Sequence, residues 1–363
     1  MGPELPLVTD TDFQRVRRAM LLRGEGDRVP LFEISIHDSL KAGILGRSVE
    51  SPEDEVAFWR RAGYDFVSIR AGVRSVVRGF HPMVREWGGT SPAPDGSGKR
   101  GWVSPGLIHD RRDFEAFPWP EPEDLGGYPD YGDMEQQLDR LTAALPADMK
   151  LLVQLGYIFM GAWQLMGFEN FCFALKRDLD LVQDVIQWLG VSQMAVLEMV
   201  LQRAEVGVVW LPDDLCFNSG PLVDPRVYEQ HVYPWYVRMI DRCHASDVPV
   251  GLHSDGDITR LLPGLVSCGF DAIHPFEPPV NDIVAAKRVW GDRIAVAGNI
   301  DLTRTLCEGG PEDVDAEVRE KAARLAPGGG WLVGSSNSIP DFVPLENYRA
   351  LLAASLRYGR YHA

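Results

Sequence analysis

The chain has 363 residues, of which 45% are hydrophobic and 24% are charged, and this balance predicts a globular protein with a large core. The formal net charge is −16, which argues against nucleic acid and anionic membranes as partners because both require basic surface. The N-terminus carries acidic residues where a signal peptide would be basic, and no apolar run approaches the length that crosses a membrane. We therefore expect a cytoplasmic protein.

Apolar strands and amphipathic helices alternate along the chain. The expected helices cover 10–23, 52–62, 131–145, 160–175, 179–204, 223–246 and 345–359. The expected strands cover 29–35, 64–70, 150–156, 206–214, 249–256, 270–278, 293–301 and 329–339. Eight strands, each followed by helix, predict parallel strands with right-handed crossovers. They close most simply into a (β/α)8 TIM barrel, and we expect a single α/β domain over 1–363.

An open doubly wound sheet is the alternative fold, but it is less favoured because no GxGxxG sequence follows the first strand. Residues 71–130 interrupt the alternation and are rich in Gly, Pro, Trp and charge. A segment of this length predicts an insert or lid over the barrel mouth, with a β-hairpin around 84–103. Trp87 and Trp102 of this insert are expected to cover the mouth or to meet a partner protein.

The sequence PVGLHSDG at 249–256 is the clearest candidate site, because an apolar strand leads directly into polar residues. His253 and Asp255 stand at i and i+2, so both side chains can lie on one side of the strand end. A histidine beside a carboxylate there can bind a metal or move a proton. The alternative is a solvated turn that caps the next helix.

In a barrel, the polar residues that follow each strand converge on one cup. The other members of this cup are Glu33, His37, Arg70, Gln154, Tyr157, Asp213, Asp214, Glu277, Asn299, Asp301 and Ser335. Such an acidic cup suits a divalent metal or a cationic or polar substrate.

Several of these residues have a purely structural alternative. Asn299 and Asp301 could cap the following helix, and the two aspartates after the fourth strand could pair with Arg70. His274 precedes a proline in a buried strand and is interpreted as a satisfied core histidine. The five scattered cysteines include no CxxC pair, which predicts reduced thiols, and Cys216 alone is kept as a site candidate.

Longer motifs carry a resemblance to a known family. HSDG after VPV, CGFDAIHPFEP, NDIVAAKRVWGDRIAVAGNID, APGGGWLVGSSNSI and PLENYRAL followed by YGRY resemble the uroporphyrinogen decarboxylase superfamily. The resemblance covers at least 200–363 and, more weakly, the chain from RVPLFE onward. It implies a (β/α)8 barrel and one of two activities. These are uroporphyrinogen decarboxylation in porphyrin biosynthesis, or methyl exchange with a corrinoid (cobalamin) protein.

The resemblance favours the methyltransferase branch. True decarboxylases carry an arginine-rich first-strand segment that holds substrate carboxylates, whereas VPLFEISIHDSL contains no arginine. They also end the second strand with an aspartate, where this chain has Arg70 nearby. An acidic cup without those arginines would repel a porphyrinogen with eight carboxylates. Uroporphyrinogen decarboxylase remains the alternative, and a non-catalytic corrinoid-binding barrel is the second.

The methyltransferase branch typically binds zinc through His-x-Cys on strand five and a cysteine on strand eight. His253 matches the histidine, Asp255 stands at the first cysteine, and Ser335 or Ser336 at the second. A metal site of His253, Asp255 and Glu277 is therefore expected, for zinc or another divalent ion. Its harder ligands suit activation of an oxygen, such as that of a methoxyl ether, so demethylation of a methoxy compound is the expected reaction.

The resulting assignments divide the cup by role. The expected catalytic residues are His253, Asp255 and Asp213. The expected substrate-binding residues are Glu33, His37, Arg70, Tyr157, Asp214, Asn299, Asp301, Ser336 and Asn337. The methyl-carrying corrinoid is expected to be supplied by a partner protein.

Overall fold

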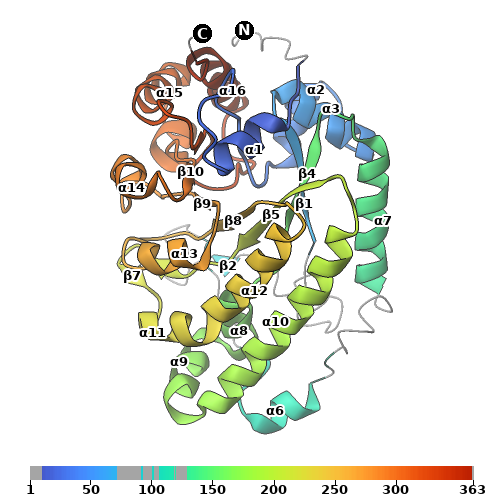
Figure 1. Ribbon diagram of the computed structural model, residues 1–363, viewed down its shortest axis with the longest axis vertical. Helices are drawn as coiled ribbons and strands as arrows, with labels where there is room; N and C mark the ends of the chain where they lie inside the picture. The colour runs from blue at the N-terminus through green and yellow to red at the C-terminus, as the bar shows by residue number, and fades with distance from the viewer. Residues whose placement is uncertain are drawn as a thin grey trace.

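Seven strands form one parallel sheet, hydrogen-bonded in the order β1-β4-β5-β8-β9-β10-β11 (Figure 1). The computed structural model describes residues 10–71, 91–92, 100–101, 106–117, 119 and 129–361. The strands of the sheet are β1 (Phe66–Arg70), β4 (Lys150–Gln154), β5 (Val206–Pro212), β8 (Val250–His253), β9 (Ala272–His274), β10 (Ala295–Ala297) and β11 (Trp331–Leu332). Each lies inside a predicted strand, which confirms the α/β class and the parallel arrangement.

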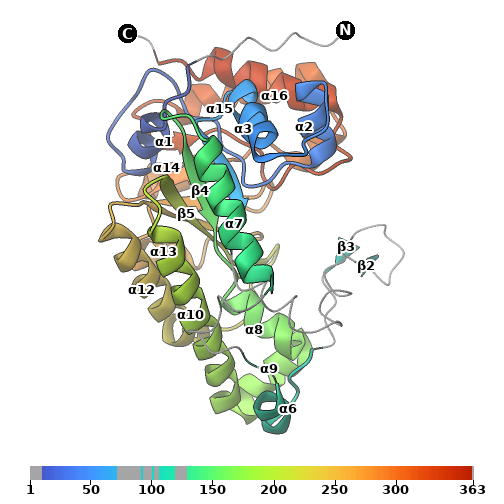
Figure 2. The same ribbon diagram turned by 90° about the vertical axis from the view of Figure 1, so that its right-hand side faces the viewer.

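Helices connect the strands and cover the outer face of the sheet. Figure 1 shows α10 and α12 side by side along this face, and Figure 2 shows α7 running from the end of α3 along the molecule. In chain order they are α1 (Gln14–Met20), α2 (Asp38–Leu45), α3 (Pro52–Ala62), α6 (Arg111–Ala116), α7 (Pro129–Ala144), α8 (Phe159–Met166), α9 (Phe168–Arg177), α10 (Leu179–Leu201), α11 (Pro225–Val227), α12 (Tyr233–His244), α13 (Leu262–Cys268), α14 (Ile283–Trp290), α15 (Pro311–Leu325) and α16 (Leu345–Tyr358). Two π-helical turns complete the set, η2 (Tyr228–Val232) and η3 (Leu302–Cys307).

Local sequence explains where α3 begins and ends. Ser51 and Asp54 form a reciprocal capping box, and Pro52 occupies the first turn, where its missing N–H costs nothing. Gly63 ends the helix in the left-handed region at φ 92°. The predicted helix over 52–62 is confirmed residue for residue.

Other helices differ from the prediction. The predicted helix over 160–175 is two helices, α8 and α9, because Gly167 adopts φ 75° and breaks the run. Helix α2 was not predicted, and His37 caps its start by accepting from the backbone N–H of Ser39. Histidine is not a typical N-cap residue, so this helix start carries little sequence signal.

The first predicted strand, 29–35, lies beside β11. The backbone N–H of Phe32 donates to Val333 O at 2.8 Å, and that of Val333 donates to Pro30 O at 3.0 Å. Toward β1, the Ser68 hydroxyl donates to Ile34 O at 2.7 Å. No backbone hydrogen bond joins residues 29–36 to residues 66–70. The sheet is thus shown over seven strands, and its closure as a complete barrel remains a prediction.

The range predicted as an insert, 71–130, is described only in part. Within it, β2 (Ser91–Pro92) and β3 (Arg100–Gly101) pair antiparallel, inside the range predicted for a hairpin, and α6 follows. Trp87 and Trp102 lie outside the described residues. The role of this segment as a lid remains a prediction.

Helix α10 corrects the expectation that no apolar run reaches membrane-spanning length. Its 23 residues are long and apolar enough to cross a membrane by length and composition alone. However, 56% of its most apolar stretch is buried inside the protein. Such burial is typical of a core helix that packs against a sheet and its neighbours.

Large aromatic side chains fill the space enclosed by the sheet. The Phe32 ring lies 4.5 Å from the Trp210 ring and 5.9 Å from the Phe66 ring, centroid to centroid, and all three side chains are fully buried. Gly251 makes this packing possible, because a Cβ there would stand 2.1 Å from the Trp210 ring. These side chains form a packed core against the sheet, which leaves the strand ends as the place for a site.

Candidate active site

Three side chains at the carboxyl ends of β5 and β8 converge. Asp214 follows β5, His253 ends β8, and Asp255 stands two residues further on. Because the two strands pair in parallel with Pro212 opposite His253, their ends meet at one edge of the sheet. One potential ligand atom from each of the three residues lies within 4.8 Å of the others. The Nε2 of His253 is 3.4 Å from Asp255 Oδ1 and 3.8 Å from Asp214 Oδ1.

Hydrogen bonds fix the two carboxylates of this cluster. The backbone N–H of Asp255 donates to Asp214 Oδ1 at 3.1 Å, and the Asn337 amide donates to both carboxylate oxygens of Asp255 at 3.0 and 2.8 Å. Burial, and then the charges of Asp214 and Glu277, raise the pKa of Asp255 well above its ordinary value. Among the described residues no lysine or arginine forms an ion pair with Asp214 or Asp255.

Glu277, an expected ligand, lies beside this cluster and is not part of it. Its Oε2 accepts from the backbone N–H of Gly256 at 3.0 Å. Asp214, which the sequence analysis assigned to substrate binding, takes the third position instead. The Asp214–His253–Asp255 group is called the mouth cluster below.

His274 was interpreted as a satisfied core histidine, and it is buried and hydrogen-bonded as expected. It also contacts the mouth cluster, because β8 and β9 pair in parallel with His253 opposite His274. The two Nδ1 atoms are 2.8 Å apart, and His274 Nε2 is 3.1 Å from the carbonyl oxygen of Ser335. Burial lowers the pKa of both histidines, that of His274 well below its ordinary value with a further contribution from His253.

The two serines at the position of the second family cysteine are committed elsewhere. The Ser335 hydroxyl donates to Glu33 Oε2 at 2.7 Å and also contacts the carbonyl oxygen of Asn337. The Ser336 hydroxyl accepts from the backbone N–H of Leu302 at 3.0 Å. Neither hydroxyl belongs to the mouth cluster, so the potential metal-ligand atoms beside His253 are carboxylate oxygens.

Glu33, expected to bind substrate, is instead fully buried against Ser335. Its two carboxylate oxygens accept from the backbone N–H and the hydroxyl of Ser335, both at 2.7 Å. Burial raises the pKa of Glu33 to about 8, although these hydrogen bonds favour the charged form. This carboxyl group therefore holds the chain after β11 in place.

Asp213, expected to be catalytic, has a structural environment. Its carboxylate accepts the backbone N–H groups of Ile158, Phe159 and Met160 at 3.1, 2.9 and 2.7 Å, where α8 begins. The Tyr236 hydroxyl donates to Asp213 Oδ2 at 2.7 Å. Burial raises the pKa of Asp213 to about 6 against these bonds. The side chain thus anchors the chain after β4.

The remaining predicted residues divide into caps and rim positions. Asp301 caps η3 by accepting from the backbone N–H of Arg304 at 2.9 Å, and Asn299 donates to Phe276 O at 2.5 Å. Arg70 is exposed at the end of β1, and its charge adds to the lowering of the pKa of His253. Of the other positions, His37 caps α2, and Gln154 donates from its side-chain amide to Ile34 O. Tyr157 and Asn337 are partly buried, and Cys216 is a buried free thiol.

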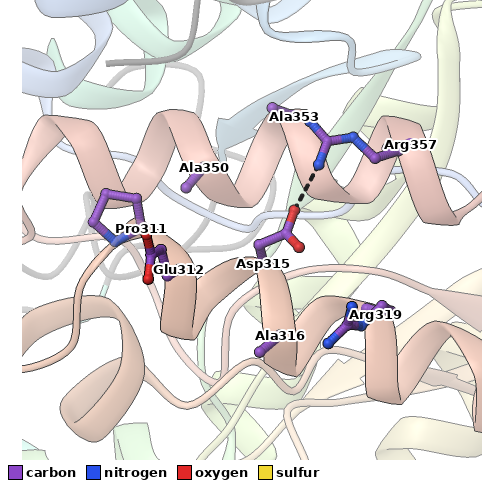
Figure 3. Close-up of a pocket in the computed structure, with 8 residues that line it drawn as sticks. All are labelled: Pro311, Glu312, Asp315, Ala316, Arg319, Ala350, Ala353 and Arg357. Atoms are coloured by element: carbon purple, nitrogen blue, oxygen red, sulfur yellow. Dashed lines mark hydrogen bonds and ion pairs between the residues drawn. The ribbon is translucent and has the colours of Figure 1, made fainter. Parts of the chain in front are cut away.

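A surface pocket of about 300 Å³ lies away from this edge of the sheet, between α15 and α16 (Figure 3). Ala350 and Ala353 line it from α16, and the Arg357–Asp315 ion pair spans it at 2.8 Å. It contains no part of the mouth cluster, and we assign it no role in the chemistry.

Sequence reasoning missed two contacts, one that holds the structural carboxylate of Asp213 and one within the site. Tyr236 comes from the middle of α12, where an apolar periodicity hides its hydrogen bond to Asp213. His274 was seen but not connected to His253. The order of the predicted strands could have indicated this contact, because His253 and His274 lie near the ends of consecutive predicted strands that pair in parallel.

Comparison with known proteins identifies the family. The uroporphyrinogen decarboxylase (URO-D) family model matches residues 97–358. The chain belongs to this family. Two relatives are methylcobamide:CoM methyltransferases. MtaA of Methanosarcina barkeri is 27% identical over 201 residues, 51% of this chain and 55% of that protein. MtbA of Methanosarcina mazei is 25% identical over 142 residues, 39% of each chain.

The family member described here thus stands closer to the methyltransferases than to the decarboxylase that gives the family its description. The chain matches about half the length of MtaA. A solved structure, a methyltransferase from Methanosarcina mazei, superposes with a TM-score of 0.71 at 17% identity. The superposition covers 96% of this chain and 99% of that one, so the two proteins share a fold.

Proposed function

We propose that this protein is a corrinoid-dependent methyltransferase, which exchanges a methyl group between a small molecule and a corrinoid carried by a partner protein. The mouth cluster carries this proposal, because two carboxylates and an imidazole face one another without a basic partner among the described residues. Similarity to two methylcobamide:CoM methyltransferases supports it. The role of the partner is taken from the activity of those relatives.

The donor set fits a divalent metal, with zinc as the first candidate. Asp214, His253 and Asp255 would hold it, and three protein ligands leave a coordination position for substrate, as catalytic zinc sites do. Carboxylate oxygens and a neutral imidazole are also acceptable to other divalent ions. When bound, the metal acts as a Lewis acid that polarises the substrate atom to which the methyl group is attached.

The hardness of this donor set favours an oxygen-bound methyl group. Thiolate ligands would reduce the positive charge on the metal, whereas His253 and two carboxylates provide a harder environment. We therefore infer that the small molecule is a methoxy compound and that the reaction is its O-demethylation. Arg70, Tyr157 and Asn299 stand at or after the carboxyl ends of β1, β4 and β10, on the same edge of the sheet, where they would contact such a substrate.

We also infer the larger architecture that this function requires. The chain would form one (β/α)8 domain over 1–363, with 29–35 as the eighth strand between β11 and β1. The bridge from Leu31 to Val333 and the hydrogen bond from Ser68 to Ile34 support that closure. Residues 71–130 would cover the mouth or contact the corrinoid protein.

Metal content measured by inductively coupled plasma mass spectrometry tests the proposal. We expect near-stoichiometric zinc in the wild-type protein, lost in His253→Ala and Asp255→Ala. His231→Ala, outside the mouth cluster on η2, is the matched control and should retain the metal. Corrinoid-dependent demethylation should disappear in the same two variants, with circular dichroism unchanged.

Two outcomes would overturn the assignment. If His253→Ala and Asp255→Ala both keep full activity, the mouth cluster is not the site. If the wild-type protein binds no metal after zinc is added back, metal activation is removed. Turnover of uroporphyrinogen would then support the decarboxylase alternative. Absence of both methyl transfer and uroporphyrinogen decarboxylation would support a non-catalytic corrinoid-binding barrel.

A further inference from the structure

We propose that His274 is a positioning residue that keeps the proton of His253 on Nδ1, so that the Nε2 lone pair faces Asp214 and Asp255. This inference rests on the metal site of the proposed function. It adds a residue that lies behind the mouth cluster and would bind no metal itself.

The hydrogen-bond partners of His274 determine where its proton lies. The carbonyl oxygen of Ser335 can only accept, so His274 Nε2, at 3.1 Å, carries the hydrogen. His274 is fully buried, and burial favours the neutral ring, whose Nδ1 is then an acceptor. One hydrogen must lie between the two Nδ1 atoms at 2.8 Å, and His253 therefore donates it.

The same reasoning fixes the other nitrogen of His253. The ring is 7% exposed, and such burial disfavours its doubly protonated form. With its hydrogen on Nδ1, neutral His253 presents a lone pair at Nε2. That lone pair faces carboxylate oxygens at 3.4 and 3.8 Å, which are acceptors when ionised.

The opposite tautomer would give a different site. A hydrogen on Nε2 would point toward the side of Asp214 and Asp255, and that nitrogen would have no lone pair for a cation. By accepting from Nδ1, His274 removes this option and leaves the Nε2 lone pair available to bind a cation beside the two carboxyl groups. His274 thus determines whether Nε2 of His253 presents a lone pair or a hydrogen to the two carboxyl groups.

The carbonyl group that orients His274 is itself held in place. Ser335 is bound to Glu33 through both its backbone N–H and its hydroxyl. Glu33 comes from the first predicted strand, Ser335 follows β11, and His274 and His253 end β9 and β8. The series Glu33, Ser335, His274 and His253 therefore crosses from one side of the mouth to the other through buried groups.

Nitrogen-15 NMR of the metal-free wild-type protein, labelled at histidine, tests the tautomers directly. We expect the ring signature of a protonated Nδ1 for His253 and of a protonated Nε2 for His274, assigned with His253→Ala and His274→Asn. A protonated Nε2 in neutral His253 would overturn the inference. This readout does not depend on activity or on metal binding, so it stands even if the proposed function fails.

Zinc affinity, measured by competition with a chromophoric chelator, tests the consequence. His274→Leu removes the acceptor and should weaken zinc binding about 10–100-fold, the usual effect of losing a partner behind a metal ligand. His274→Asn places an amide oxygen near the former Nδ1 and should restore most of the affinity. Equal affinity of folded His274→Leu and wild-type protein would overturn the inference. Absence of zinc binding in the wild-type protein would refute the metal site on which the inference rests.

Discussion

Two groups of buried charge lie at opposite ends of the parallel strands and are organised differently. At the amino end of β1, Asp65 is fully buried and contacts two guanidiniums, Arg15 Nη1 at 2.9 Å and Arg28 Nη2 at 3.1 Å. At the carboxyl ends of β5 and β8, Asp214 and Asp255 face a histidine and no described arginine or lysine pairs with them.

The difference separates a structural network from a candidate site. The group at the amino end supplies its own counter-charge and needs nothing from solution, as structural ion networks do. The mouth cluster brings two carboxyl groups together without a basic partner, which costs free energy whether both ionise or one keeps its proton, unless a cation is added. Clusters of this unfavourable kind are typical of functional sites, where binding offsets the cost.

The largest effect on stability is expected at the amino end. Asp65→Asn removes the carboxylate between two buried guanidiniums and should lower the free energy of unfolding by about 3 kcal/mol or more. Asp27→Asn is the matched control. Asp27 also pairs with Arg15, but its side chain is 57% exposed, so a loss below about 1 kcal/mol is expected. Urea denaturation measures both, and equal losses would contradict the comparison.

Glu33 is a buried carboxyl group that, among the described residues, pairs with no guanidinium and lies outside the mouth cluster. Its pKa in the folded protein is about 8, above the ordinary 4.5, so between these values the folded state binds more protons than the unfolded state. Its contribution to the free energy of unfolding should fall by about 1.4 kcal/mol per pH unit as the pH rises through this window.

Comparison with Glu33→Gln isolates that contribution. The stability of the variant relative to the wild type should increase from pH 5 to pH 7.5 in urea denaturation. A difference that does not change with pH would show that Glu33 has an ordinary pKa and is ionised in the folded protein.

The smallest effect on the free energy of unfolding is expected for a substitution in the mouth cluster, which should stabilise the metal-free protein. In metal-free protein, Asp214→Asn removes a charge that helps to raise the pKa of Asp255, while an amide oxygen still accepts from the backbone of Asp255. The free energy of unfolding should rise by about 1 kcal/mol at pH 7. With zinc present the order should reverse, because the wild type alone gains full binding energy. Destabilisation of the metal-free variant would show that Asp214 has a structural role.

The sequence predicted some parts of the site better than others. His253 and Asp255 were predicted because an apolar strand leads directly into them. Asp214 was assigned to substrate binding and Asp213 to catalysis, although the two are adjacent in sequence and their side chains have different partners. One side chain turns to the start of α8 and the other to His253, a choice that depends on what lies across the sheet.

Periodicity and strand-end chemistry by themselves predicted the α/β class, the seven of eight strands that form the parallel sheet, and a candidate site at His253 and Asp255. These follow from local patterns, because the apolar repeat sets the element type and parallel strands end at one edge. Only the tertiary structure placed His274 behind His253, Ser335 against Glu33 and Asp214 in the mouth cluster. Those contacts join residues between 21 and 302 positions apart in the sequence. They depend on how the strands are aligned with one another, and no local sequence pattern specifies that alignment.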